Sequence, residues 1–127
     1  MAMTIQQFFA SYLDGQRRHS ADAICGFYAL PCLIADGSGQ QVLGDRDAVL
    51  RHVQRQLAAH TASGTTSERL TIRSLLLLGD DFAVANVAWS MRDSNRNLRT
   101  FHAAYNVRRV NGDWAIWAVT QHESVKE

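Results

Sequence analysis

Cysteine, proline and long apolar runs are scarce in this sequence of 127 residues. No apolar run approaches the ~20 residues that a membrane-spanning helix needs, and the run Leu75 to Leu78 ends at Gly79. The first residues lack the basic segment and apolar stretch of a secretory signal peptide. We therefore expect a cytoplasmic protein without a membrane partner, in which reduced Cys25 and Cys32 are favoured over a disulfide between them.

An excess of charge of either sign is also missing, because 13 lysine and arginine residues are balanced by 12 aspartate and glutamate residues. This balance gives no electrostatic reason to expect nucleic acid or an anionic membrane as a partner. Hydrophobic residues make up 46% of the chain and charged residues 20%, as in a globular protein with a substantial core. We expect residues 1–127 to form one domain.

The strongest local signal is a β-hairpin folded over Asn111 and Gly112. An Asn-Gly pair suits a type I′ turn, which needs a positive φ at both central residues. The two arms, 99–110 and 113–122, are long and rich in aromatic and branched residues, which indicates the centre of a sheet.

Three amphipathic segments in the first half of the chain predict helices. Thr4 and Gln7 form a capping box ahead of the first, and Ser20 and Asp45 are the expected N-caps of the second and third. Apolar residues at helical spacing give each segment a buried side. They are Ile5, Phe8, Phe9, Tyr12 and Leu13 in the first, Ile24, Phe27 and Tyr28 in the second, and Val49, Leu50, Val53 and Leu57 in the third.

The remaining apolar segments predict strands and turns. Expected strands lie at 32–35, 40–43, 68–78, 82–91, 99–110 and 113–122, with a loop at 60–66. The strand that begins at Glu68 is expected to be buried on both faces where it ends, at Leu75 to Leu78. Helices gathered before consecutive antiparallel strands indicate an α+β fold, in which the helices cover one face of a twisted sheet and leave a hollow for a small ligand.

Four features occur together in the chain: the amphipathic helix carrying Tyr12, the segment Phe27–Gly37, Gly44 ahead of the third helix, and Asn111–Ile116 at the last turn. With the order of elements, they resemble the nuclear transport factor 2-like superfamily, which includes SnoaL-like cyclases and ketosteroid isomerase. The resemblance implies a cone-shaped fold with three N-terminal helices on a strongly bent, mainly antiparallel sheet, a conical cavity and a homodimer. This fold hosts enzymes, binding modules and assembly domains alike.

The resemblance also suggests catalytic groups. Asp36 falls where ketosteroid isomerases carry the aspartate that moves a proton next to a carbonyl, and Tyr12 falls near their oxyanion site. Ala104 replaces the third isomerase group, a protonated aspartic acid, which leaves His102 or Asn106 as donors on the same strand face. Asp36 also fits a simple Asp-Gly turn, and Tyr12 equally completes the apolar side of its helix.

The hairpin register sorts these residues by face. With a two-residue turn, Asn106 would lie beside Trp117, on the face that also carries His102 and that the resemblance assigns to the cavity. The opposite face, which carries Phe101 and Trp114, would be buried elsewhere, for example in a dimer. A single β-bulge would exchange the two faces.

Metal and cofactor sites are not expected. In the predicted register His102 and His122 lie on opposite faces of the hairpin, and no spacing of Cys and His residues fits zinc. The chain also has no phosphate-binding glycine loop, no nucleotide fingerprint and no Ser-His-Asp motif. We therefore expect neither a metal nor a cofactor.

Three functional hypotheses follow from these observations. The first is a pocket for a small, mainly apolar molecule, lined by Phe9, Tyr12, Phe27, Asp36, Trp89, His102, Asn106 and Trp117. The second is an isomerase- or cyclase-type enzyme that moves a proton next to a carbonyl without a metal, with Asp36 as base and Tyr12, together with His102, as donors. The third is an assembly domain that forms a homodimer through the outer sheet face, expected to carry Phe101 and Trp114.

Overall fold

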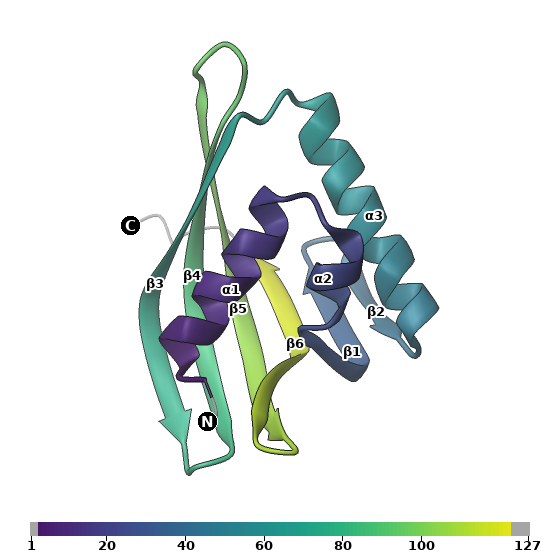
Figure 1. The fold of residues 1–127 in the computed structure, drawn as a ribbon, viewed down its shortest axis with the longest axis vertical. Coiled ribbons are helices and arrows are strands. Elements are labelled where there is room, and N and C mark those ends of the chain that lie inside the picture. The colour runs from purple at the N-terminus through teal and green to yellow at the C-terminus, as the bar shows by residue number, and fades with distance from the viewer. Residues whose placement is uncertain (1–2, 123–127) are drawn as a thin grey trace.

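The computed structural model describes residues 3–122, which fold into three helices and six strands. In chain order these are α1 (Ile5–Arg17), α2 (Ala21–Cys25), β1 (Tyr28–Asp36), β2 (Gly39–Leu43), α3 (Arg46–Ala62), β3 (Ser67–Leu78), β4 (Phe82–Arg92), β5 (Leu98–Val110) and β6 (Asp113–His122). The strands form one sheet in the order β2-β1-β6-β5-β4-β3, in which only the β1–β6 pair is parallel. The predicted α+β fold, with three helices and a mainly antiparallel sheet, is confirmed (Figure 1).

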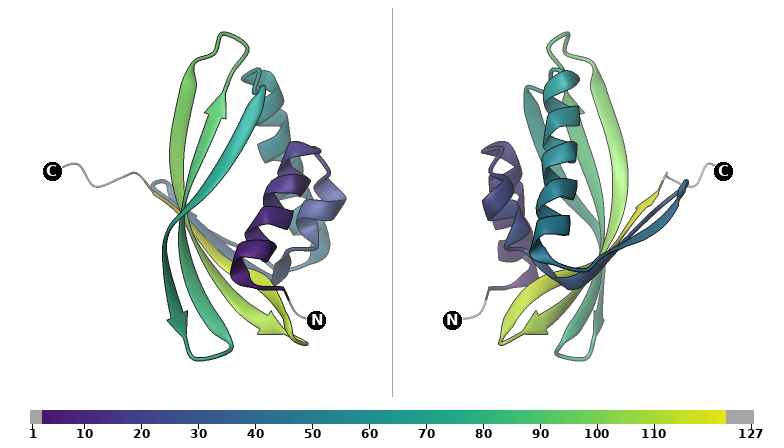
Figure 2. Two further views of the ribbon diagram at one scale, coloured as in Figure 1. Left: turned by 60° about the vertical axis from the view of Figure 1, so that its left-hand side comes forward. Right: turned by 90° about the vertical axis from the view of Figure 1, so that its right-hand side faces the viewer.

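The sheet is strongly bent, and the helices lie together on its concave side (Figure 2). We call the sheet face that the helices cover the inner face, and the opposite one the outer face. This arrangement is the cone that the sequence resemblance implies. None of the helices in residues 3–122 combines the length and the apolar character of a membrane span.

The caps confirm all three predicted helix starts. The backbone N–H of Thr4 donates to Oε1 of Gln7 at 2.9 Å, and the backbone N–H of Gln7 donates to Oγ1 of Thr4 at 3.1 Å. Ser20 and Asp45 each accept a bond from the backbone N–H three residues later, at 3.3 and 2.8 Å. Each helix therefore begins where a side chain replaces a missing intrahelical bond.

Two element boundaries differ from the prediction by more than one residue. α3 continues through the first part of the predicted loop at 60–66 and ends at Ala62, where the backbone N–H of Ser63 still donates to Ala59 at 3.0 Å. β1 begins at Tyr28, which the sequence places on the buried side of a helix, because Tyr28 pairs with Ile116 of β6. Pairing with a distant strand outweighs the local helical pattern here.

The apolar stripe predicted on α1 is buried against the inner face. Phe9 and Tyr12 are 1% and 2% exposed. The ring centroid of Phe9 lies 5.4 Å from that of Tyr105 on β5, and the ring of Tyr12 lies 6.0 Å from that of Trp89 on β4. Burial of large apolar side chains stabilises a fold by about 1.5–3 kcal/mol each, so these contacts hold α1 on the sheet.

A β-bulge interrupts the last hairpin. The pairing predicted next to the turn is confirmed, but the register shifts between Asn106 and Val107. Val107 pairs with Ile116, whereas Asn106 pairs with Ala118. Trp117 is the extra residue of β6, and its side chain is 38% exposed.

The predicted assignment of the two hairpin faces is wrong. Tyr105 and Trp114, expected away from the cavity, are buried under the helices, because the more apolar side of β5 packs on the helices. Asn106 and Trp117 therefore lie on the outer face. The surface predicted for a dimer, which carries Phe101 and Trp114, is used within the chain itself. The homodimer remains a prediction, and the outer face is the one left for it.

The end of β3 is exposed rather than buried. Leu76, Leu77 and Leu78 are 59%, 62% and 49% exposed. The prediction of burial on both faces is wrong because β3 is an edge strand whose last residues extend beyond the end of α1 (Figure 1). The neighbouring Phe82 is 43% exposed, so the strand ends on both sides of the β3–β4 turn carry exposed apolar side chains.

Candidate functional site

A pocket of about 760 Å³ lies between the helices and the inner face of the sheet. Its walls come from α1, from α3, from both ends of β1, and from β4, β5 and β6. Pockets for drug-sized ligands usually enclose about 300–1,000 Å³, so the volume suits a ligand of several rings. The hollow predicted from the order of elements is therefore present.

Hydroxyl groups of three tyrosines meet in this pocket. The hydroxyl oxygens of Tyr12 on α1 and Tyr28 on β1 lie 2.7 Å apart. The indole Nε1–H of Trp89 donates to the hydroxyl of Tyr105 at 2.9 Å. The hydroxyl of Tyr105 and the side chain of Gln16 also act as hydrogen-bonding neighbours of Tyr12. Trp89, Tyr105, Tyr12 and Tyr28 thus form a continuous chain, which we call the tyrosine chain.

The three hydroxyls of the tyrosine chain are uncharged, and one of their hydrogens is not used within the chain. Burial raises the pKa of Tyr12 and Tyr105 well above the usual range, and burial raises the pKa of Tyr28 as well. Each neutral hydroxyl carries one hydrogen, and the two links between the three hydroxyls use two of them. The remaining hydrogen can be donated to an oxygen of a bound molecule.

Aromatic contacts hold this chain in place. The ring of Tyr12 lies edge-on to the rings of Phe27, Trp89 and Tyr105, with centroid distances of 5.5, 6.0 and 5.7 Å. Edge-to-face contacts of this kind are favourable beyond simple burial. The donor at the pocket is therefore positioned before any ligand arrives.

α3 contributes an uncharged polar wall. His52, Gln56 and His60 all line the pocket. Burial lowers the pKa of His52, and the charge of Arg55 lowers it further. Burial also lowers the pKa of His60, with Arg99 adding to the effect. Both imidazoles are therefore neutral at neutral pH. No lysine or arginine among the described residues lines the pocket.

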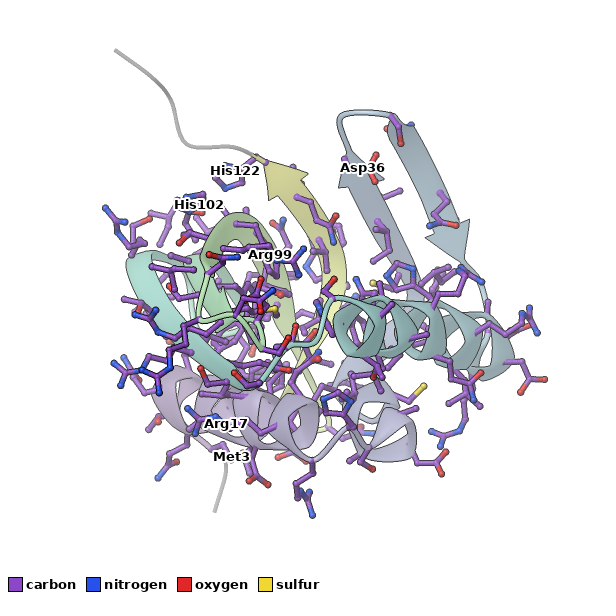
Figure 3. The ribbon with its side chains drawn as sticks, turned by 90° about the horizontal axis from the view of Figure 1, so that it is seen from above. Met3, Arg17, Asp36, Arg99, His102 and His122 are labelled. Carbon is purple, nitrogen blue, oxygen red and sulfur yellow. The ribbon has the colours of Figure 1, made fainter. Side chains whose placement is uncertain are left out.

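Asp36 borders the pocket, at the tip of the β1–β2 hairpin (Figure 3). Its carboxylate is exposed and accepts two bonds from Ser38, at 2.6 Å from the hydroxyl and 2.8 Å from the backbone N–H. The hydroxyl of Ser38 and its backbone N–H lower the pKa of Asp36. A base that moves a proton from carbon usually needs the opposite shift. The geometry is that of an Asp-Gly turn, the simpler of the two interpretations offered by the sequence.

His102 and His122 are neighbours rather than residues of opposite faces. They pair across β5 and β6, and their rings stack with a centroid distance of 5.6 Å (Figure 3). The predicted separation is wrong because the bulge at Trp117 turns His122 to the same face as His102. Nε2 of His122 lies 2.8 Å from Oδ1 of Asn86. Both histidines border the pocket, His122 at the end of β6 and His102 within β5.

The predicted lining residues divide into three groups. Tyr12 and Trp89 line the pocket, while Asp36 and His102 border it. The other predicted lining residues lie elsewhere: Phe9 and Phe27 pack behind Tyr12, and Asn106 and Trp117 lie on the outer face. In residues 3–122 no group of three or more metal-ligating side chains is found.

Sequence reasoning missed several polar residues of the site, among them Gln16, Tyr28, His52 and Tyr105. Tyr105 would have been found by placing the more apolar side of β5 towards the helices. His52 follows Val49 at helical spacing, which was a signal that it faces the same side. Gln16 follows Tyr12 by four residues, which was the same kind of helical signal. Tyr28 had no local signal, because pairing between β1 and β6 places it.

Comparison with known proteins identifies the family. The model of the family described as NTF2-like protein (DUF6841) matches residues 2–124. No curated protein matches the sequence.

Solved structures share the fold at low sequence identity. An NTF-2 like protein of unknown function from Shewanella oneidensis has a TM-score of 0.76 at 15% identity, covering 92% of this chain and 94% of that one. An NTF2-like protein with a cystatin-like fold from Novosphingobium aromaticivorans has a TM-score of 0.72 at 17% identity, covering 92% and 77%. A ketosteroid isomerase-like protein from Erwinia carotovora atroseptica has a TM-score of 0.65 at 12% identity, covering 94% and 95%. These likenesses extend to the fold alone, and the match over residues 2–124 shows that the chain belongs to the NTF2-like protein family DUF6841.

Proposed function

We propose that this protein binds a small, uncharged, mainly apolar molecule in the pocket, with an oxygen atom of the ligand against the tyrosine chain. The observation that carries the proposal is the 2.7 Å contact of Tyr12 and Tyr28 inside a pocket of about 760 Å³. An apolar pocket with a few convergent polar groups is the usual form of a small-molecule site.

The charges around the pocket support an uncharged ligand. Within residues 3–122 the lining has no lysine or arginine to compensate an anion, and its one carboxylate, that of Asp36, is exposed and bonded to Ser38. A charged group that enters such a site loses its hydration without gaining a partner. A neutral carbonyl or hydroxyl oxygen gains a hydrogen bond from the tyrosine chain instead.

A second candidate function is acid-base chemistry next to a carbonyl. One observation favours it: Asp36, Tyr12 and His102 all line or border the same pocket. In this alternative Asp36 moves the proton and Tyr12 stabilises the developing charge on the ketone oxygen. Unchanged turnover of a carbonyl substrate in Asp36→Asn would contradict it, and binding without turnover would leave the first function standing.

Binding is tested by titrating the protein with benzophenone and following amide and indole signals by two-dimensional NMR. Diphenylmethane is the matched control, because it has the same two rings without the carbonyl oxygen. We expect saturable shifts at Tyr12, Tyr28 and the Trp89 indole, and an affinity for benzophenone about tenfold higher than for diphenylmethane, as one hydrogen bond provides. The absence of saturable shifts with both compounds would overturn the proposal.

A further inference from the structure

Three side chains of α3 form an uncharged polar edge along the pocket. His52, Gln56 and His60 follow one another at intervals of four residues, so they share one face of the helix. At 1.5 Å per residue the edge is about 12 Å long. All three residues line the pocket. We call this row the α3 edge.

The central observation concerns His52, which is only 9% exposed. Its ring has no hydrogen bond to any other residue of the described part of the chain, and its nitrogens are not among the fully enclosed polar atoms there. Because His52 lines the pocket, a molecule in the pocket can reach its ring. Buried imidazoles in proteins nearly always have a partner, so this one is available to a bound molecule.

The sheet side of the pocket is aromatic. The rings of Trp89 and Phe101, both in the lining, stack with a centroid distance of 6.2 Å and an interplanar angle of 13°. Flat rings prefer stacked or edge-on contacts with other flat rings. The aromatic wall can therefore contact the flat face of a ligand, while the polar α3 edge contacts the atoms at its rim.

We propose that the α3 edge selects a flat, uncharged ligand with a hydroxyl group on its rim, in addition to the oxygen held by the tyrosine chain. This inference deepens the proposed function and rests on it. A neutral imidazole offers one donor and one acceptor, and the amide of Gln56 offers both as well, so either orientation of a hydroxyl is satisfied. A rim of alkyl groups would leave His52 desolvated without a partner.

Two probes isolate this interaction. In para-(hydroxymethyl)benzophenone a hydroxyl group replaces the last methyl group of para-ethylbenzophenone, and the ketone and both rings are unchanged. We expect the hydroxymethyl probe to bind about tenfold more tightly to the unmodified protein, measured by the same NMR titration. In His52→Leu or Gln56→Leu the ratio of the two affinities should fall towards one. Gln54→Leu, on the exposed side of the same helix, is the matched control and should keep the full ratio.

The outcomes separate this inference from the proposed function. Equal binding of the two probes, with shifts at the tyrosine chain, would overturn the role of the α3 edge and leave the proposed function intact. Absence of binding by both would overturn the two together. If a variant fails to fold, the imidazole signals of His52 in the unmodified protein give a second measurement of the role of the α3 edge. They should shift with the hydroxymethyl probe and stay in place with the ethyl probe, and the reverse pattern would contradict the inference.

Discussion

The hydroxyl of Tyr12, on the first helix, lies 2.7 Å from that of Tyr28, on the first strand. Both hydroxyls are buried, and this burial raises the pKa of both groups. The contact links the helix layer to the sheet by a polar bond between side chains of the pocket. Removing one partner leaves the other buried without its bond, and such groups are costly.

Tyr28→Phe and Tyr12→Phe should each lower the free energy of unfolding by about 1 kcal/mol, measured by urea denaturation. The double variant should lose less than the sum of the two, because the second substitution removes a hydroxyl that has already lost its partner. Additive losses would show that the two hydroxyls are independent in solution.

Glu68→Gln should raise the free energy of unfolding at neutral pH by about 1 kcal/mol. The Glu68 side chain is 3% exposed, its Oε2 has no hydrogen-bond partner in residues 3–122, and its Oε1 lies 3.9 Å from Nε2 of His19. Burial raises the pKa of Glu68, although His19 and Arg17 lower it in part. The folded state therefore binds a proton more readily than the unfolded state does.

The raised pKa of Glu68 also predicts how the stability difference between the unmodified protein and Glu68→Gln depends on pH. A carboxyl with a raised pKa contributes stability below its unfolded value of 4.5, and that contribution is lost as the pH rises through the folded value. The advantage of Glu68→Gln should thus be largest at neutral pH and shrink in acid. Asp14→Asn is the control, since Asp14 forms an exposed ion pair with Arg18 and should change stability little. A destabilised Glu68→Gln at neutral pH would contradict the prediction.

The tryptophans should respond differently to benzophenone. Trp89 is 2% exposed and lines the pocket, whereas Trp117 is 38% exposed in the bulge of β6. With the other two tryptophans replaced by phenylalanine, the emission of Trp89 should change saturably with benzophenone. The emission of Trp117 in the matching variant should be quenched by iodide and not by benzophenone at the same concentrations. A saturable response of Trp117 would place the ligand on the outer face.

The helices were predictable because their signals are local. Thr4, Ser20 and Asp45 cap neighbouring backbone groups, and the stripe that includes Phe9 and Tyr12 is visible in the order of residues. Such signals act within a few positions, so the fold class and the pocket followed from the sequence together with the resemblance. The register of the last hairpin was predictable only as far as Val107, because nothing local marks Trp117 as the extra residue.

The polar groups of the site were harder to predict, because sheet pairing assembles them. Tyr28 reaches Tyr12 through the pairing of β1 with β6, and Tyr105 reaches Trp89 across β4 and β5. The resemblance pointed to Asp36, whose carboxylate is bonded within its own turn. Only Tyr12 was predicted both from the local helical pattern, which buries it, and from the resemblance, which assigns it to the cavity that it lines.

The parallel pairing of β1 with β6 has a consequence for the order of assembly. Ile34 pairs with Val119, so strands from opposite ends of the chain must meet before the sheet is complete. The hairpins of β3, β4, β5 and β6 close through short turns, whereas this pairing closes a loop that contains most of the protein. Closing this loop costs more chain entropy than closing a hairpin, so we expect it to follow the hairpins. Without β6, Tyr28 has no strand to pair with and is not held against Tyr12. The pairing of β6 with β1 therefore completes the contact between Tyr12 and Tyr28.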